Sequence, residues 1–437
     1  MSRTRGLRIL FHHRVAAADG MRVHIAELVE ALRAEGHEVL VVGPGAAAEG
    51  PAGVSTRLER VADLLRSRVP AGAFEALELL YNVPAYWRLR AAAKAFRPDV
   101  LYERYNLFLL AGLLLKTQLR LPLLLEINSP LAEERRTHGN LQFKGLGRRC
   151  EAALWRGADA ALPVTQVLAE TVRAVRGDGP IAVIPNGANI NRRSATGSAT
   201  RLSLGLDKDS VVLGFVGFVR AWHGVGWAVE ALAELPERAH LVVVGDGPGT
   251  AALSERAEAL GVDHRLHLVG RVPHEEVAAY MQAFDVALQT AAVSYASPLK
   301  LFEYMALERA VIAPDQPNIR EVLAHGRDAL LFPAGDRAGF IAALHRLCED
   351  PELRLHLGRN AGRTVREHPF TWRHNAKRIA EFARALISGS TVPAGDAAGS
   401  ATRREASCPS RLGGRRDRAR ATGASAGPPG ACPGRAP

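Results

Sequence analysis

Short apolar runs, each followed by a polar or glycine-bearing loop and a helix-like stretch, recur along most of this chain. After the first run, 7–11, apolar side chains from Val23 to Leu32 keep a period near 3.6, and a second run follows at 38–43. A strand, a helix and a second strand in this order predict a parallel β-α-β unit. The pattern therefore predicts an α/β protein built on parallel sheets. Further strand-like runs lie at 99–102, 121–127, 159–164, 181–185, 211–217, 240–248, 266–273, 285–289 and 310–313.

Length and composition predict two globular domains and a tail. The 437 residues exceed what one core organises and fit two domains of roughly 150–200 residues. Small polar residues at 191–200 suit a linker, and the last fifty residues have too little apolar bulk to fold. We therefore expect a first domain at 1–190, a linker at 191–203, a second domain at 204–367, a helix at 368–387 and a disordered basic tail at 388–437.

The net charge of +11 suggests nucleic-acid binding, but its distribution argues against it. Eight arginines and three acidic residues lie in the tail, which therefore carries nearly half of the excess. The sequence has no basic strand studded with aromatic residues and no finger motif. The modest positive charge of the remainder suits contact with anionic nucleotides or with a lipid surface, and no nucleic acid is expected as a partner.

The sequence shows no leader peptide and no segment apolar enough to span a bilayer. Its most apolar run, 107–115, is too short, and charged residues and a proline interrupt its continuation. We expect a cytoplasmic protein, with contact at the inner face of the membrane as a further hypothesis. No metal or cofactor is expected, because acidic clusters are absent and the four cysteines lack metal-ligand or disulfide spacing. These are Cys150, Cys348, Cys408 and Cys432.

The segment from 58 to 96 mixes basic, apolar and aromatic residues and leaves two interpretations open. It includes Phe74, Tyr81, Tyr86 and Trp87. One interpretation is a pair of surface helices that covers the first sheet. The other is a region that faces the acceptor or the membrane, since basic amphipathic helices bind anionic interfaces.

The segment 297–306 carries the strongest functional pattern, a helix that begins after a strand and a loop. Ser297 is a good N-cap and Pro298 fits the first helical position. The first turn of such a helix, with Leu299 and Lys300, favours an anion such as a diphosphate at the end of a strand. Glu303, one turn later, can accept hydrogen bonds from ribose hydroxyls. The alternative is a well-capped helix whose charged residues are only solvated.

This segment resembles the donor-binding helix of retaining, glycogen-synthase-like glycosyltransferases of family 4, in which the glutamate of a "KxxEyMa" pattern holds the ribose of the nucleotide. Other segments resemble the same family. Gly245 and Gly247 lie in a turn like its "vGdGp", Asn186 lies in a loop like its "PNG", and Val272 lies in a segment like the one whose backbone reads the base. The resemblance covers 7–386.

Several positions differ from the family pattern. Tyr295 stands where a glutamate usually faces the sugar, and Asn128 stands where a histidine usually lies near the reacting centre. Phe218 and His223 replace an arginine and a lysine that usually bind the diphosphate after Gly217. Arg220 is a candidate to supply the missing charge.

The resemblance implies the GT-B fold, two Rossmann-like domains with parallel sheets that face each other across a cleft. It implies metal-independent, retaining transfer of a sugar from a nucleotide sugar to a sugar, lipid-linked or small-molecule acceptor, in polysaccharide, lipid-linked glycan or glycoconjugate biosynthesis. A nucleotide-sugar epimerase of the same architecture and a glycosyltransferase-like binding protein without catalysis are the alternatives. The candidate catalytic residues are Asn128, Lys300 and Arg220; those for the donor are Gly217, His223, Gly245, Gly247, Val272, Ser297, Pro298, Leu299, Lys300 and Glu303; those for the acceptor side are Gly20, His12 and Asn186.

Overall fold

The computed structural model describes residues 5–15, 20–44, 71–137, 139, 141–190 and 197–390. The described residues all lie in one compact unit, Met1–Gly399. We call the described residues up to 190 the first lobe and residues 197–370 the second lobe. The predicted tail from 391 onward, with Cys408 and Cys432, lies outside the described residues, as does the start of the predicted linker.

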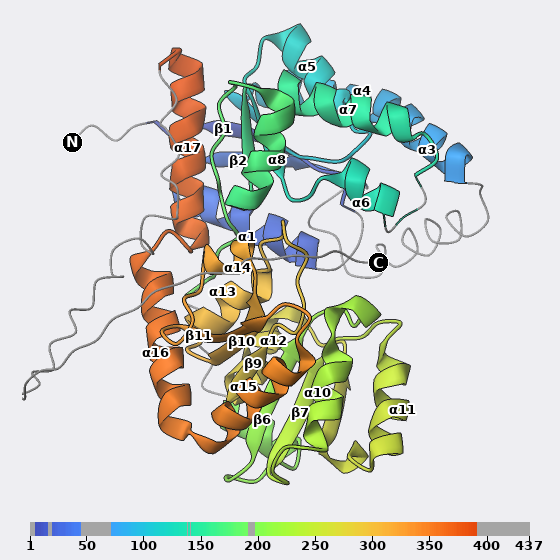
Figure 1. Cartoon of the computed structure of the whole chain (residues 1–437). Helices are drawn as coiled ribbons and strands as arrows, with labels where there is room; N and C mark the ends of the chain where they lie inside the picture. Colours follow the sequence, from blue (N-terminus) through green and yellow to red (C-terminus); the bar gives the residue numbers. More distant parts are fainter. Residues whose placement is uncertain are drawn as a thin grey trace, which may run out of the picture. The chain divides into compact units, whose positions relative to one another are not determined.

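The first lobe is built on a five-stranded parallel sheet with strand order β2-β1-β3-β4-β5 (Figure 1). Alternate residues of each strand face opposite layers: Ile9 and Phe11 lie in the core under α1, while Leu10 lies in the core under α4 and α5. The strands are β1 (Arg8–His12), β2 (Glu38–Val42), β3 (Val100–Arg104), β4 (Leu123–Ile127) and β5 (Ala160–Pro163). The helices are α1 (Gly20–Ala34), α3 (Ala71–Leu80), α4 (Asn82–Phe96), α5 (Ala111–Leu119), α6 (Leu131–Thr137), α7 (Lys144–Gly157) and α8 (Gln166–Arg176).

The second lobe is built on a six-stranded parallel sheet with strand order β11-β10-β9-β6-β7-β8. One face packs against α10, α11 and α15, and the other against α12, α13 and α16. The strands are β6 (Val211–Val216), β7 (Ala239–Val244), β8 (Leu266–Gly270), β9 (Val286–Leu288), β10 (Ala310–Asp315) and β11 (Ala329–Pro333). The helices are α9 (Gly197–Ser203), η1 (Ala221–His223), α10 (Val225–Leu232), α11 (Thr250–Leu260), η2 (Asp263–Arg265), α12 (His274–Ala283), α13 (Leu299–Ala306), α14 (Pro317–Arg320), α15 (Arg337–Glu349) and α16 (Pro351–Glu367).

The last described helix, α17 (Trp372–Ser388), returns to the first lobe. It is the orange-red helix of Figure 1 and packs beside α1. Trp372, Ile379 and Phe382 are buried in the same core layer as β1 and α1. Thr371 caps the helix, because its side chain accepts a hydrogen bond from the backbone N–H of His374. The first lobe is therefore completed by residues that follow the second lobe in the sequence.

The predicted α/β fold with two parallel sheets is confirmed, and one local expectation was wrong. The run 181–185 is not a regular strand, although it lies along β5: Ala182 and Ile184 donate backbone hydrogen bonds to the carbonyls of Ala161 and Pro163. On its outer side Val183 and Pro185 accept hydrogen bonds from side chains of α17 instead of pairing with a strand. Within the predicted linker, Gly197–Ser203 forms helix α9, which packs against α12.

Candidate functional site

Helix α13 begins two residues after Ser297, and the predicted N-cap role of this serine was wrong. Pro298 occupies the cap position, and no side chain caps the helix. The Ser297 hydroxyl instead accepts a hydrogen bond from the backbone N–H of Asn186 at 3.1 Å. The side-chain amide of Asn186 donates to the Ser297 carbonyl at 2.6 Å. The backbone N–H of Asn186 therefore uses the hydroxyl oxygen that would otherwise cap the helix. Buried backbone N–H groups rarely stay unpaired.

Lys300, in the first turn of α13, extends to the carboxyl end of β6. Its Nζ lies 3.8 Å from the centre of the Phe215 ring. A Cβ placed on Gly217, whose φ is +135°, would lie 3.3 Å from the same nitrogen. Burial lowers the pKa of Lys300 from 10.5 to about 7, and the nearby charge of Glu303 only partly opposes this shift. Lys300 is thus a half-buried amine whose protonated, charged form a nearby anion would favour.

Close approach of two loops explains the glycines after β6 and β7. A Cβ on Gly245 would lie 2.1 Å from the backbone oxygen of Gly217, and one on Gly247 would lie 2.2 Å from that of Val219. The Val219 N–H also donates to the Asp246 carbonyl at 3.0 Å. Any side chain at these glycines would therefore separate the loops. The structure brings Gly217, Gly245 and Gly247 together, and the Lys300 amine lies beside this group, next to Gly217.

The loop after β6 places its basic residues in different surroundings. Arg220 is exposed, and its guanidinium carbon lies 4.9 Å from the centre of the Phe218 ring and 4.8 Å from that of Trp222. His223 is half-buried at the end of η1, where its carbonyl accepts a hydrogen bond from Thr290. Burial, then the charge of Lys300, lowers the pKa of His223 to about 4. At neutral pH this ring is an uncharged hydrogen-bonding group.

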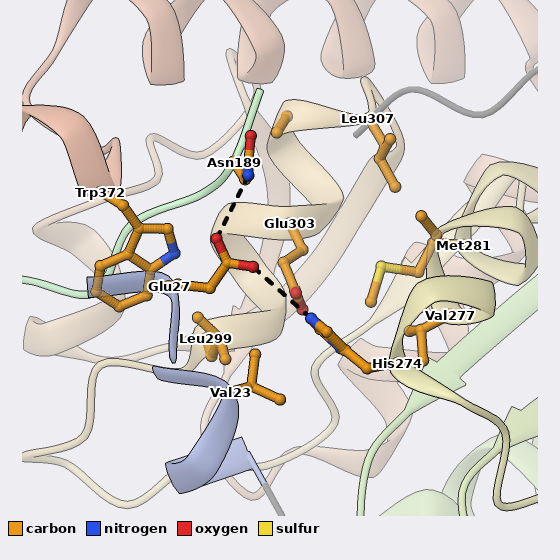
Figure 2. Close-up of a pocket in the computed structure, with 12 residues that line it drawn as sticks. Val23, Glu27, Asn189, His274, Val277, Met281, Leu299, Glu303, Leu307 and Trp372 are labelled. Carbon is orange, nitrogen blue, oxygen red and sulfur yellow. Dashed lines mark hydrogen bonds and ion pairs between the residues drawn. The ribbon is translucent and has the colours of Figure 1, made fainter. Parts of the chain in front are cut away.

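Glu303 is half-buried and lines a pocket in which residues of both lobes meet (Figure 2). In Figure 2, Glu27 of α1 bonds to Asn189 Nδ2 at 3.4 Å and pairs with His274 Nε2 at 3.7 Å. The cavity volume is about 30 Å³, which is room for about one water molecule. Trp372 and Met281 add apolar walls. Local sequence patterns do not select Glu27, Asn189 or His274, because these residues lie far apart in the chain.

Two of the remaining donor-side candidates, Val272 and Leu299, lie at the ends of secondary-structure elements. Val272 is half-buried and lies just beyond the end of β8, and Leu299 is half-buried at the start of α13. Leu299 packs against the core of the first lobe and also lines the pocket beside Glu303.

Tyr295 points from the second lobe to the first. Its hydroxyl donates to a carboxylate oxygen of Glu134 in α6 at 3.0 Å, and its carbonyl accepts from the Thr165 hydroxyl at 2.9 Å. Burial, then the charge of Glu134, raises the pKa of the phenol well above its ordinary value. The tyrosine therefore joins the lobes at the position where the resembling family has a glutamate.

Among the acceptor-side candidates, His12 is a core residue. It ends β1, is buried, and its Nδ1 lies 2.5 Å from a carboxylate oxygen of Glu103. Gly20 begins α1, is exposed, and a Cβ there would meet no atom within 4 Å. Nothing in its surroundings therefore requires a glycine.

Asn128 belongs to a buried polar network around Glu126, at the end of β4. The Glu126 carboxylate accepts from Asn128 Nδ2 at 2.6 Å, from the Tyr102 hydroxyl at 2.6 Å and from Arg104. It also lies 3.0 Å from Nε2 of His24 in α1. Burial alone would raise the pKa of Glu126, but the charges of His24 and Arg104 outweigh it and hold the pKa well below its ordinary value. His24 was not selected from the sequence, because a buried histidine on an apolar helix face gives no local signal.

The described residues contain no group of three or more His, Cys, Asp or Glu side chains arranged to hold a metal ion. None of the helices in the described ranges is long and apolar enough to cross a membrane. Cys150 and Cys348 are buried free thiols.

Two family models match this chain. One, described as glycosyl transferases group 1, matches residues 210–350, and the other, described as a glycosyl transferase 4-like domain, matches residues 19–187. The two matched ranges correspond to the two lobes.

Characterised relatives are similar at modest identity. The chain spans about half or less of the length of the first relatives it matches. These are alpha-D-kanosaminyltransferase of Streptomyces kanamyceticus, at 28% identity over 36% of this chain and 41% of that enzyme, and D-inositol 3-phosphate glycosyltransferase of Corynebacterium urealyticum, at 28% identity over 47% and 51%. The match to D-inositol 3-phosphate glycosyltransferase of Thermobispora bispora, at 26% identity, covers 86% of this chain and 93% of that enzyme.

Solved structures share the fold. Sucrose-phosphate synthase from Thermosynechococcus elongatus superimposes with a TM-score of 0.68 at 22% identity, over 88% of this chain and all of that one. HepE from Anabaena, in complex with UDP and glucose, superimposes with a TM-score of 0.67 at 20% identity, over 87% of this chain and all of that one.

Proposed function

Because this chain belongs to the group 1 glycosyltransferases and has the GT-B fold, we propose that it moves a sugar from a nucleoside diphosphate sugar to an acceptor hydroxyl with retention of configuration. The observation that carries this proposal is the placement of Lys300. Its amine lies beside Gly217 at the carboxyl end of β6, where parallel sheets place their ligands. It also lies in the first turn of α13, whose amides favour an anion.

In the proposed reaction, the bond between the anomeric carbon and the diphosphate oxygen breaks while a bond to the acceptor oxygen forms on the same face of the sugar. The acceptor proton passes to an oxygen of the departing diphosphate. The chain's task is to stabilise the charge that develops on the diphosphate, which requires cations and amides placed in advance. Lys300 and the first-turn amides of α13 meet this need. The uncharged ring of His223 adds a hydrogen-bonding group, and Arg220 is the candidate for a further charge.

The proposed reaction needs no metal, because the chain itself supplies the cation and the amides. Glu303 is proposed to accept hydrogen bonds from the two ribose hydroxyls, and the backbone at Val272 to contact the base. UDP is the first nucleotide to test, since HepE binds UDP and UDP-glucose. Asn128, whose amide is fixed by Glu126, is proposed to bond a hydroxyl of the transferred sugar.

For the acceptor we propose a sugar, a lipid-linked glycan or a small hydroxylated molecule, used in the cytoplasm at the inner face of the membrane. The D-inositol 3-phosphate glycosyltransferases support a small phosphorylated acceptor as one member of this class. Contact with the membrane is supported by α3 and α4. The stretch 79–98 has no acidic residue, and its four basic residues, Arg88, Arg90, Lys94 and Arg97, are all exposed.

A binding protein without transferase activity is the second candidate. Two observations favour it: Tyr295 bonds to Glu134 where the family has a sugar-facing glutamate, and His223 is uncharged where the family has a lysine. Nucleotide-sugar binding without transfer to any acceptor would support this candidate. Release of a free, altered sugar without an acceptor would instead support an epimerase.

The test is titration calorimetry of uridine, guanosine, thymidine and adenosine diphosphates, and of their sugars, on the wild-type chain and on Glu303→Ala. We expect one nucleotide to bind and Glu303→Ala to weaken it about 10- to 100-fold, because hydrogen bonds to a charged group contribute about 1.5–3 kcal/mol. Glu255→Ala, which removes an exposed carboxylate of α11, is the control and should bind normally. Failure of the wild-type chain to bind any of these nucleotides would contradict the proposal.

A further inference from the structure

A chain of buried hydrogen bonds runs from the end of β4 in the first lobe to the start of α13 in the second. Glu126 lies 3.0 Å from His24 Nε2, and His24 Nδ1 lies 2.7 Å from the side-chain oxygen of Asn186. Asn186 in turn donates to Ser297 twice, from its side-chain amide at 2.6 Å and from its backbone N–H at 3.1 Å. These four residues are between 2% and 9% exposed. No step of the proposed reaction requires His24, yet it is buried at the centre of this chain.

The direction of each hydrogen bond is fixed by its partner. The Asn186 Nδ2 donates to a carbonyl, so its Oδ1 must be the atom that faces His24, and it accepts from Nδ1. The other ring nitrogen faces a carboxylate, which accepts as well. The imidazole therefore donates at both ends. The Trp372 ring, 4.9 Å away and nearly perpendicular, holds its plane.

The same carboxylate also holds the residue proposed to contact the transferred sugar. One oxygen of Glu126 accepts from Asn128, and the other lies beside His24. The buried Glu126 carboxylate of the first sheet therefore positions Asn128 directly and the start of α13 through His24 and Asn186. By contrast, the groups proposed to bind the nucleotide, Lys300, Glu303 and the backbone at Val272, all belong to the second lobe.

We infer that His24 and Asn186 are positioning residues, which hold the first turn of α13 in a fixed place relative to the first sheet. The donor sugar then lies correctly placed relative to Asn128 and the acceptor. This inference rests on the proposed function. Breaking the chain of hydrogen bonds should slow sugar transfer, because a misplacement of about 1 Å can cost about 100-fold in rate. It should lower nucleotide affinity far less than the rate, because the variants remove no group that contacts the nucleotide.

Two variants interrupt the chain at different places. His24→Ala removes the link between Glu126 and Asn186. Asn186→Asp keeps the acceptor for His24 but replaces the amide that donates to Ser297, with almost no change of volume. The matched control is His37→Ala, which removes another buried histidine of the first lobe whose hydrogen bond, to the backbone of Leu7, is remote from this chain.

Two readouts separate the inference from the function on which it rests. The first is amide hydrogen exchange of the nucleotide-free protein, followed in peptides that cover 295–306. We expect faster exchange there in His24→Ala and Asn186→Asp but not in His37→Ala. The second is steady-state transfer together with nucleotide affinity. We expect kcat to fall at least tenfold in both variants while nucleotide Kd changes less than threefold, with both constants unchanged in His37→Ala.

Normal exchange at 295–306 in both variants would overturn the inference. A nucleotide Kd that rises in proportion to the fall in kcat would also overturn it, because the chain would then belong to the nucleotide site itself. If the wild-type chain neither binds nucleotides nor transfers sugar, the proposed function fails. Faster exchange in the two variants would still support the positioning role in that case.

Discussion

At the scale of single residues, surroundings rather than residue type decide the chemistry. Lys300 lies over the Phe215 ring, and burial lowers its pKa to about 7. His223 has a pKa of about 4, again mainly through burial. Around Glu126, by contrast, the charges of His24 and Arg104 outweigh burial and keep the carboxyl ionised. Without a bound anion, the proposed donor site thus holds an uncharged histidine and a lysine whose pKa is close to neutral pH.

Binding of a diphosphate should therefore be accompanied by proton uptake at Lys300. Burial lowers the pKa of this lysine to about 7, and a bound anion would favour the charged form and raise the pKa again. At pH 8 the Lys300 amine is mostly neutral before binding, so binding should take up close to one proton, and affinity should fall as pH rises above about 7. Calorimetry at pH 8 in two buffers of different ionisation enthalpy measures this uptake.

The variant that checks this prediction is Lys300→Met, which keeps the apolar stem and removes the amine. It should bind nucleoside diphosphate more weakly and without buffer-dependent heat. Lys208→Met, at an exposed position of the second lobe, should retain both the affinity and the proton uptake of the wild-type chain. Equal uptake by Lys300→Met and wild type would assign the proton to another group.

At the scale of elements, α3 and α4 together expose a run of large apolar side chains. Leu77, Leu80, Val83 and Trp87 recur at a spacing of three or four residues and are 49%, 64%, 59% and 58% exposed. Arg90 lies over the Trp87 ring at 5.4 Å. Both interpretations of this segment receive support, since the buried residues Ala85, Leu89 and Ala93 cover the first sheet while the outer surface is apolar and basic.

We expect this outer surface to bind anionic vesicles. The double variant Leu80→Ser with Trp87→Ser should lower binding to phosphatidylglycerol-containing vesicles at least tenfold, because each side chain contributes about 1.5–3 kcal/mol when fully buried. Flotation of the protein with vesicles measures the bound fraction. Purely zwitterionic vesicles should bind the wild-type chain weakly, since the basic residues then have no partner.

Leu355→Ser is the matched control for that experiment. Leu355 lies in α16 of the second lobe and is 51% exposed, so its loss removes a comparable exposed apolar side chain elsewhere. It should leave vesicle binding unchanged. If the double variant binds as well as wild type, contact of α3 and α4 with lipid is ruled out, and they serve only to cover the sheet.

At the scale of the whole molecule, the lobes are joined by hydrogen bonds that cross between them. The Glu321 carboxylate, in the second lobe, accepts from the backbone N–H groups of Gln166 and Val167 at the start of α8. Burial raises the pKa of Glu321, although these two N–H bonds act against the shift. The carboxylate therefore serves as a helix cap supplied by the other lobe.

Removing this cap should destabilise the protein measurably. Glu321→Ala leaves two N–H groups of α8 without their acceptor, and we expect the free energy of unfolding to fall by about 1–3 kcal/mol. Urea unfolding followed by tryptophan fluorescence measures the change in midpoint. Glu255→Ala should stay within about 0.5 kcal/mol of wild type, as expected for an exposed surface carboxylate.

Much of the fold could be predicted because it depends on short stretches of chain. Apolar periodicity located the parallel strands, and the wrong expectations arose where distant groups compete for the same atoms. Serine is a favoured N-cap residue, but the Ser297 hydroxyl accepts a hydrogen bond from the backbone of Asn186, 111 residues away. The run 181–185 bonds to β5 on one edge, and on the other edge side chains of α17 take the carbonyls that a further strand would pair with.

The sequence by itself determined the α/β class, the two parallel sheets and the residues of the helix that carries Lys300 and Glu303, because turn chemistry and side-chain periodicity act within a few residues. Only the tertiary structure decided the lowered pKa of Lys300, the meeting of Glu27 with His274, and the chain from Glu126 through His24, a contact between residues 102 positions apart. These features depend on which distant segments pack against one another and so exclude water from the groups between them. Desolvation and long-range hydrogen bonding are properties of that packing, which no local stretch of sequence specifies.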